Sequence, residues 1–518
     1  MHASKPKLPV RQLVVLSLCR FAEPIAVTSY LPYLPEMIES VGVREPEVAK
    51  WAGITTAVSS FAQAGMAVHW GRTSDRFGRK PITLLGLTAT MIFSLFFGLS
   101  KDLWMLIACR LIVGLMNGNV GILRTMVAEM VQDKELQPKA FSIMPMIWTI
   151  GSIFGPSLGG SLAKPAEKFP EVFGDSKFFK EYPFFLPNLV TCVFFIFGIS
   201  TGWLFLHETL QAKQGQRDTG IVLGRLLTRP CTGRRQKGTR KGAEDDEVAP
   251  LLGDRQPASQ VELKRPAWRD VLRPQSTLIL LTYTLMSVHT MAFESLVPVF
   301  LHTPPQRLEN NRDVDLPFKF AGGSGMDAQR IGIFYTITGI IGIVVQFYVF
   351  PACAKRFGVL NCVKVSAAVF PFIYFLTPFV SLIPGPLCDI SICLLIGSKL
   401  TASIFNFPGI TILLTNSASS LSVLGTLNGV ATSVSALGRA AGPALLGPIF
   451  SLGLKAGYII IPWWFLSFLS VVSGIPTLFI VEGDGFQRQS SVPEPELERE
   501  EGDDEGTRTI KDHDQVRS

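Results

Sequence analysis

Charged side chains lie inside long apolar stretches of this 518-residue chain, and they are the residues that could do chemistry. The six that stand out are Arg20, Glu23, Arg110, His289, Glu294 and Lys399. A charge within an apolar segment is costly, so it usually marks an ion or substrate path or pairs with another charge. In such surroundings a carboxylate or an imidazole can exchange protons near neutral pH, and Arg or Lys can attract an anion. The pattern therefore predicts proton exchange or anion binding.

Neighbouring residues leave alternatives open for several of these side chains. Arg20 and Glu23 are three residues apart and share a helical face, so they form either a structural ion pair or a proton-exchange site. Glu294 has no adjacent cation in its own stretch, which favours it as the proton carrier. His289 is either a hydrogen-bonded packing residue or a proton relay. Arg124 lies nearer the end of its stretch, where a long side chain can reach the interface.

Apolar helices must position these charged residues. Hydrophobic residues make up 47% of the chain and charged residues 17%, below the figure of about a quarter expected of a soluble domain. A helix needs roughly 20 mostly apolar residues to cross a bilayer. Twelve windows qualify, in two groups of six: roughly 13–34, 52–71, 82–99, 103–127, 141–162 and 184–206, then 277–301, 329–352, 359–382, 388–413, 422–450 and 457–481. The chain is therefore predicted to be an all-α polytopic membrane protein with twelve transmembrane helices.

The two groups of six windows repeat the same short motifs. Arg76-Phe77-Gly78 follows the second window, and Arg356-Phe357-Gly358 follows the eighth. The fifth window carries Gly151–Pro156 and the eleventh carries Gly438–Pro443, each with the pattern Gly-x-x-x-Gly-Pro. Two motifs in register indicate a duplicated unit. They predict two pseudo-symmetric six-helix bundles with a substrate site between them near the bilayer midplane.

Charge and composition divide the chain further. The bundles are expected at 13–206 and 277–481, with a largely disordered cytoplasmic linker at 207–276, since that segment is polar and highly charged. Residues 1–12 form a basic N-terminus and residues 482–518 an acidic tail. The formal net charge is +7, and Lys and Arg concentrate in loops, as in the cytoplasmic loops of membrane proteins. Both termini are therefore expected to be cytoplasmic, and the basic residues indicate orientation instead of nucleic-acid binding.

The loop after the second window is the most specific motif. Its predicted gating residues are Gly71, Asp75, Arg76, Gly78, Arg79 and Lys80. Gly71 and Gly78 permit a tight turn and close approach of the backbone. Asp75 can pair with an Arg or accept from a helix N-terminus, and such contacts can form in one conformation and break in another. The second half has Lys355 where Asp75 would map, so the device is asymmetric.

The fifth window is rich in small residues. Its motif comprises Gly151, Gly155, Pro156, Gly159 and Gly160. Small residues let membrane helices approach closely, and a proline bends a helix. Helix packing is therefore the simplest role for this motif.

These motifs resemble a known family. The loop is similar to the signature loop between helices 2 and 3 of the major facilitator superfamily, where it acts as a cytoplasmic gate latch. The fifth window resembles the antiporter motif of the twelve-helix drug:proton antiporter branch, which implies export. Arg110–Gly118 resembles the helix 4 motif, whose Arg is tied to proton transfer. In this family helices 1, 4, 7 and 10 line the cavity, and all four carry charged groups here.

A narrower resemblance comes from Cys19–Pro32, Gly425–Gly429 and Arg439–Pro443. These segments are similar to the fungal tetracycline-resistance-like and zinc-induced-facilitator-like group, whose members export drugs or small organic ligands in exchange for protons. The group usually has Pro-Glu-Thr after helix 6, whereas this chain has His207-Glu208-Thr209, so the local geometry of that turn can differ.

The sequence therefore predicts a proton-coupled exporter of small organic compounds that works by alternating access. Alternatives are a carrier of an endogenous organic anion or metal chelate, drawn by Arg20, Arg110 and Lys399, and a membrane sensor that does not transport. An enzyme is disfavoured because the sequence has no phosphate loop, metal-ligand cluster or nucleophile elbow. We expect a monomer in the bilayer that uses a proton gradient and no cofactor or metal, in the plasma membrane or alternatively the vacuolar membrane.

Overall fold

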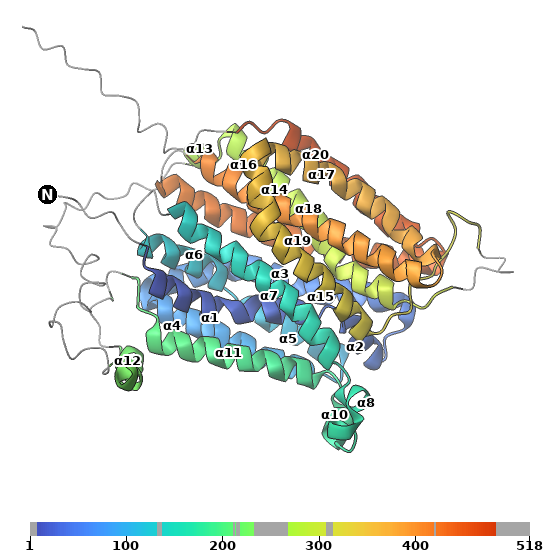
Figure 1. Ribbon diagram of the computed structural model, residues 1–518, viewed down its shortest axis with the longest axis horizontal. Helices are drawn as coiled ribbons and strands as arrows, with labels where there is room; N and C mark the ends of the chain where they lie inside the picture. Colours follow the sequence, from blue (N-terminus) through green and yellow to red (C-terminus); the bar gives the residue numbers. More distant parts are fainter. Residues whose placement is uncertain are drawn as a thin grey trace, which may run out of the picture.

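The computed structural model describes residues 8–131, 137–210, 213, 218–232, 268–306, 314–418 and 421–482. These residues form long helices arranged as two bundles (Figure 1). In the view of Figure 1 the first half, coloured blue to green, lies below the second half, coloured yellow-green to red. The molecule has a linker end, where α12 and α13 lie, and a far end, where α2, α8 and α10 lie.

The first half contains eight main helices. They are α1 Val10–Ser29, α2 Leu34–Ser40, α3 Val48–Phe77, α4 Arg79–Gly98, α5 Leu103–Met116, α6 Asn119–Met130, α7 Gln137–Leu162 and α11 Phe185–Phe205. Four short helices cover the far end: η1 Glu45–Glu47, α8 Pro165–Lys168, α9 Pro170–Phe173 and α10 Lys177–Glu181.

The second half repeats this plan. Its elements are α14 Pro274–His302, α15 Ala328–Val344, the π-helical segment η4 Val345–Val349, α16 Phe350–Phe357, α17 Val359–Leu376, η5 Thr377–Leu382, α18 Pro386–Ser417, α19 Leu421–Ala456 and α20 Ile460–Leu478. Each of the twelve predicted windows coincides with a helix or with a broken helix. The all-α prediction is therefore confirmed.

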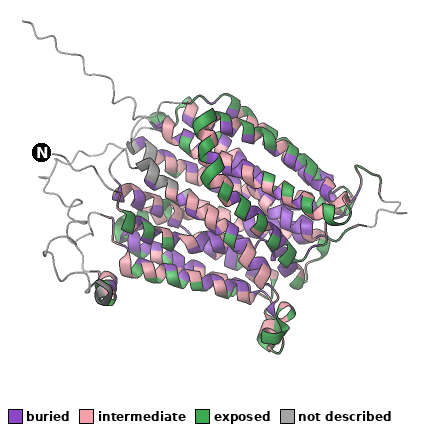
Figure 2. Ribbon diagram, viewed as in Figure 1, coloured by how far each residue is buried: buried purple, intermediate pink, exposed green. Residues whose placement is uncertain are grey.

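The outer surface of the bundles is apolar, as a bilayer requires. Within the described residues nine helices are long and apolar enough to cross a membrane, and the bent pair α1–α2, with 56° between its helices, makes a tenth. Figure 2 shows exposed residues along the outer faces of the helices, and many are large hydrophobics. Examples are Val193, Phe372, Leu394 and Phe468. The two windows outside this count form α3 and α7, which lie against the other half.

The two halves have the same internal packing. In the first half α1 packs on α7 and α11, and α4 packs on α5 and α11. In the second half the equivalent helix α14 packs on α19 and α20, and α17 packs on α18 and α20. Gly78 and Gly358, which end the repeated Arg-Phe-Gly motifs, both adopt positive φ values, of 109° and 83°. The duplication predicted from the motifs is therefore present in the fold.

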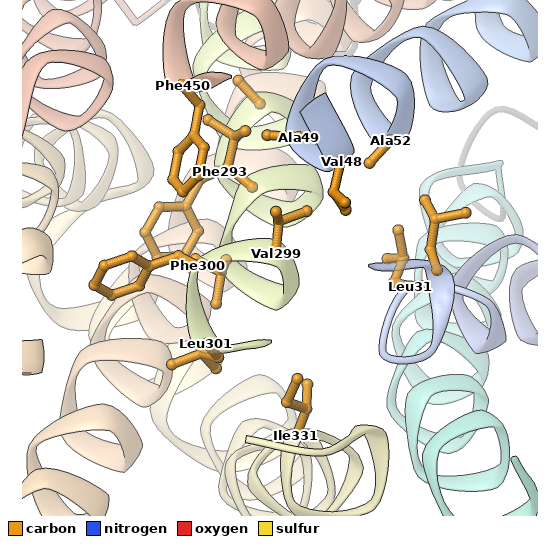
Figure 3. Packing of buried hydrophobic residues seen from close by; sticks show 14 of the residues in the cluster. Leu31, Val48, Ala49, Ala52, Phe293, Val299, Phe300, Leu301, Ile331 and Phe450 are labelled. Carbon is orange, nitrogen blue, oxygen red and sulfur yellow. The ribbon is translucent and has the colours of Figure 1, made fainter. Parts of the chain in front are cut away.

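The halves meet along a seam formed by α3 with α19 and by α7 with α15. Toward the far end this seam is filled by one buried apolar cluster with members from both halves. Figure 3 shows Leu31 and Val48 of the first half gathered with Val299 and Ile331 of the second half. The burial of apolar side chains from both halves stabilises this end of the seam.

Part of the predicted linker is helical. The segment 207–276, predicted to be a largely disordered linker, contains α12 Thr219–Thr232 and α13 Trp268–Val271. Helix α12 packs against α11, where its glycines approach the backbone of Trp203 and Leu204. The central part of that segment and the tail from residue 483 lie outside the described residues.

Candidate functional site

The first buried charge pair lies within α1. The guanidinium of Arg20 forms an ion pair with the carboxylate of Glu23, and their side chains are only 7% and 2% exposed. The second oxygen of Glu23 accepts a hydrogen bond of 2.7 Å from Nδ2 of Asn117, where α5 ends. The ring of Trp148 lies under the guanidinium of Arg20, with the Cζ atom 5.6 Å from the ring centroid. This pair is sealed from solvent and satisfied on both sides, as a structural ion pair would be.

Arg110 occupies a separate position on α5. Its Nη2 atom donates to the hydroxyl of Tyr30, at 2.9 Å, and to Oγ of Ser59, at 3.1 Å. The Cζ atom also lies 4.1 Å from the centroid of the Tyr30 ring. Arg110 therefore links α5 to α3 and to the bend between α1 and α2. The aromatic ring and the hydroxyls stabilise its charge in place of a carboxylate.

The second charge pair joins two helices of the second half. Nζ of Lys399 on α18 lies 2.6 Å from Oε1 of Glu294 on α14. Glu294 has no cation nearby in its own helix, as the sequence indicated, but a helix distant in sequence supplies its partner. Lys399 is buried, with 5% of its side chain exposed, whereas 37% of the Glu294 side chain is exposed. One end of this pair is thus open to exchange with its surroundings.

His289 lies one and a half turns before Glu294 on α14 but makes a different contact. Its Nδ1 atom is 2.9 Å from the hydroxyl of Tyr374 on α17, and the side chain is buried. The ring also packs edge-on against Phe370. Of the two roles expected for His289, this environment favours a hydrogen-bonded packing residue.

Two arginines at the seam were not assigned a site by sequence reasoning. Nη1 of Arg124 on α6 donates to Oγ1 of Thr432 on α19, at 2.6 Å. Arg124 thus crosses between the halves, whereas the sequence suggested contact with the membrane interface. Arg439 on α19 donates to Oγ of Ser435, at 3.1 Å, and to Oε1 of Gln63 on α3, at 3.4 Å. The sequence signal for both is an arginine inside an apolar window, and Arg439 also begins the segment Arg439–Pro443 that resembles the family group.

The predicted gating loop is bound to its own half. Asp75 forms an ion pair with Arg79, and Arg79 also binds Glu129 of α6, at 3.1 Å. Nη1 of Arg79 donates to Oγ of Ser74, at 2.7 Å. The carboxylate of Glu208 accepts from the backbone nitrogen of Arg79, at 2.9 Å, so it caps the start of α4. In the described part of the chain, the polar partners of Asp75 and Arg79 thus come from the first half.

Lys80 connects the same loop to α12. Its Nζ atom lies 2.6 Å from a carboxylate oxygen of Asp218 and 2.8 Å from the carbonyl oxygen of Trp203. Partial burial raises the pKa of Asp218, but the hydrogen bond and the charge of Lys80 outweigh it, so the pKa of Asp218 lies below its usual value. The ion pair therefore holds α12 against the loop at neutral pH.

Two glycines of the loop have different roles from each other. Gly78 has a φ of 109°, and the side chain of Glu208 occupies the space where a β-carbon would stand. Gly71 lies inside α3 with no neighbouring atom near that position. The prediction that Gly71 forms a tight turn is therefore wrong, because α3 continues to Phe77. Arg76 is exposed, and its guanidinium stacks on the ring of Phe77.

The glycine motif of the fifth window, which lies on α7, packs helices together. Its glycines are Gly151, Gly155, Gly159 and Gly160. The first three face α1, where a side chain on Gly159 would overlap the carbonyl group of Ser29. Gly160 and the carbonyl of Pro156 face Gly332 of α15 across the seam. In the second half Gly438 and Gly442 face α14 in the same manner, as the repeat predicts.

Polar contacts close the seam at the far end. Oε1 of Glu36 on α2 accepts from the backbone nitrogen of Ala328 at 2.6 Å, and Oε2 of Glu39 lies 3.0 Å from Nε2 of His302. The exposed side chains of Glu47 and Lys455 form a further ion pair, with Nζ of Lys455 2.9 Å from Oε1 of Glu47. Sequence reasoning missed these contacts, because each joins residues from opposite halves. Among the described residues, no group of three or more His, Cys, Asp or Glu is arranged to hold a metal ion.

Comparison with known proteins gives this architecture its family. The model of the Major Facilitator Superfamily matches residues 16–443. The chain belongs to the major facilitator superfamily. As a member of this superfamily it is a multi-pass membrane transporter, and the predicted family is confirmed.

Individual relatives narrow the group within the superfamily. A multidrug transporter of the superfamily from Aspergillus fumigatus is 36% identical over 510 residues, which cover 92% of this chain and 84% of that protein. The zinc induced facilitator 1 protein of Arabidopsis thaliana is 28% identical over 438 residues, covering 82% and 81% of the two chains. These relatives confirm the predicted group.

A solved structure agrees with the fold. The crystal structure of a human organic anion transporter superimposes with a TM-score of 0.55 at 20% identity, covering 91% of this chain and all of that one. At this identity the similarity shows the fold alone.

Proposed function

We propose that this superfamily member exports small organic compounds in exchange for protons, by alternating access between its two halves. The observation that carries the proposal is the Glu294–Lys399 pair, which joins α14 to α18 and leaves the carboxylate partly exposed. Glu23 is a poorer candidate for proton exchange, because Arg20 and Asn117 enclose it.

Protonation of Glu294 would remove the charge that holds Lys399. The 2.6 Å contact is charge-assisted, and such contacts are about twice as strong as neutral hydrogen bonds. A neutral Glu294 would leave the ammonium of Lys399 without a counter-charge in a largely apolar site, which favours a different arrangement of α14 and α18. The energy of a proton gradient can therefore reach the helices, without a cofactor.

Alternating access is supported by how the two ends of the seam differ. The far end is closed by the apolar cluster and by contacts such as Glu39–His302. At the linker end Asp75 binds Arg79 in its own half. In another conformation Asp75 would release Arg79 and bind the second half. A rocking of one half against the other would exchange these contacts.

Export as the direction is supported by the similarity to a fungal multidrug transporter. The glycine motif on α7, which holds α7 against α1, also supports it. We further propose a monomer in the plasma membrane, with both termini in the cytoplasm. The apolar outer faces of the helices provide the surface for the surrounding lipid.

The test is the cellular accumulation of a panel of fluorescent and azole-like compounds. Cells that express the wild type should accumulate less compound, and a protonophore should abolish the difference. Asp75→Asn and Glu294→Gln should abolish it as well, whereas Arg330→Gln, in an exposed ion pair on α15, should not. Unchanged accumulation across the panel would contradict drug export, and export that survives the protonophore would contradict proton coupling.

A further inference from the structure

Arg124 and Arg439 lie close together on the seam between the halves. Arg124 binds Thr432 and Arg439 binds Ser435, and these two acceptors are three residues apart on α19. That spacing corresponds to a rise of about 4.5 Å on one face of a helix. The two acceptor residues are therefore about one helical turn apart, and each binds the guanidinium group of an arginine from a different half. Arg439 lies near the middle of α19, far from either end.

The charges around Arg439 do not balance. Its guanidinium lies within electrostatic range of Arg124, Arg20 and Glu23, and of the phenol of Tyr283. Glu23 is already bound by Arg20 and Asn117. The described partners of Arg124 and Arg439 are hydroxyl and amide oxygens, which carry no formal charge. Within the described part of the chain, two positive charges at the seam thus lack a carboxylate partner, in contrast to Arg20 and Lys399.

We infer that the transported compounds carry an acidic group, a carboxylate, sulfonate or phosphate, that binds between Arg124 and Arg439. Two guanidinium groups offer paired donors that match such an anion, and the anion would supply the missing counter-charge. Because Arg124 belongs to the first half and Arg439 to the second, one bound anion would touch both halves. This inference rests on the proposed export function and specifies its substrate class.

The position of these arginines also distinguishes them from the cations first expected to attract an anion. Arg20 and Lys399 are each neutralised by a carboxylate at close range, so neither offers a free charge. Arg110 is directed at Tyr30 and Ser59 inside the first half. Arg124 and Arg439 are the seam residues whose neutral partners an anion can replace without leaving a carboxylate unpaired.

The test uses the purified full chain in vesicles of phosphatidylcholine, with an acid-inside gradient to drive uptake. The probes are dansyl sulfonate and dansyl sulfonamide, which share one fluorophore and differ in charge. We expect wild-type protein to take up the sulfonate faster than the sulfonamide. Arg124→Gln and Arg439→Gln should each lower sulfonate uptake about tenfold or more, since a hydrogen bond to a charged group has that effect. Uptake of the sulfonamide should stay unchanged.

Further variants separate charge from folding. Arg439→Lys keeps the charge and should retain part of the sulfonate uptake. Arg330→Gln serves as the matched control at an exposed site. Equal uptake of both probes by the wild type and by both glutamine variants would overturn the inference. Loss of sulfonate uptake when phosphatidylglycerol is added would also overturn it, by identifying a lipid headgroup as the occupant.

A binding measurement distinguishes failure of this inference from failure of the proposed function. If the gradient drives neither probe nor any other compound, export fails, and the anion site is judged by thermal unfolding. Sulfonate should then raise the unfolding temperature of the wild type but not of Arg439→Gln. An equal effect of sulfonate and sulfonamide on the wild type would refute the anion site.

Discussion

Replacing Glu23 by glutamine tests whether the first charge pair is structural. The glutamine would keep an oxygen for the hydrogen bond from Asn117 but would remove the counter-charge of Arg20. With 7% and 2% of the two side chains exposed, water cannot replace the lost carboxylate. Removing one partner of a buried pair costs about 3–5 kcal/mol. We therefore expect Glu23→Gln to unfold at a clearly lower temperature than the wild type.

The double variant Arg20→Met/Glu23→Met provides the matched comparison. Apolar residues in place of both charges leave no unpaired ion, and such replacements are often neutral or stabilising. The double variant should therefore be more stable than Glu23→Gln. Glu294→Gln should lower the free energy of unfolding less than Glu23→Gln does, because 37% of the Glu294 side chain is exposed.

Unfolding can be followed with a thiol-reactive dye in detergent, because the chain contains buried cysteines that react only when their surroundings open. Cys19, Cys109 and Cys192 are all buried. If Glu23→Gln unfolds together with the wild type, or if the double variant is the less stable of the two, the structural role of this pair is refuted. Glu23 would then return as a candidate proton carrier.

Three further predictions concern the loops and the seam. Gly71→Ala should be tolerated or stabilise α3 by up to about 1 kcal/mol. Gly78→Ala should destabilise the folded protein by about 1–3 kcal/mol, because Gly78 has a positive φ. Thermal unfolding of the two variants compares these effects. Glu47→Cys/Lys455→Cys, bridged by a short thiol cross-linker, should stop transport reversibly, and transport that continues would contradict alternating access. The pKa of Asp218 is lowered in the folded state, so its contribution to stability is present above its ordinary pKa and is lost as pH falls through the lower folded value. Proteolysis near α12 should therefore increase in that acidic range. Asp218→Asn should show the same increase already at neutral pH.

The helices and the repeat could be predicted from sequence because their signals are local. An apolar run long enough to cross a bilayer is visible in a single window, and all twelve windows coincide with helices. The matched motifs ending at Gly78 and Gly358 also carried the symmetry of the two halves. The breaks were not visible in the same way: one window became α5 and α6, separated at Asn117 and Gly118.

The partners of the charged residues could not be predicted, because they depend on helix packing. Glu294 and Lys399 are 105 residues apart in the chain, and Arg124 and Thr432 are 308 apart. Hydropathy shows that such residues lie in apolar windows, but it does not fix which face of a helix each occupies. Short-range pairs could be proposed from the sequence: Arg20–Glu23, three residues apart, and the pairing of Asp75 with an arginine, which proves to be Arg79, four residues away.

Proton-coupled uptake by the purified protein tests the proposed function most directly. The wild type and Glu294→Gln would be reconstituted in vesicles, and an acid-inside gradient would drive uptake of a fluorescent compound from the cellular panel while an internal dye reports pH. We predict that the wild type takes up the compound as protons leave, and that Glu294→Gln exchanges compound across the membrane without responding to the gradient. Gradient-driven uptake by Glu294→Gln at the wild-type rate would contradict the role of the Glu294–Lys399 pair in coupling.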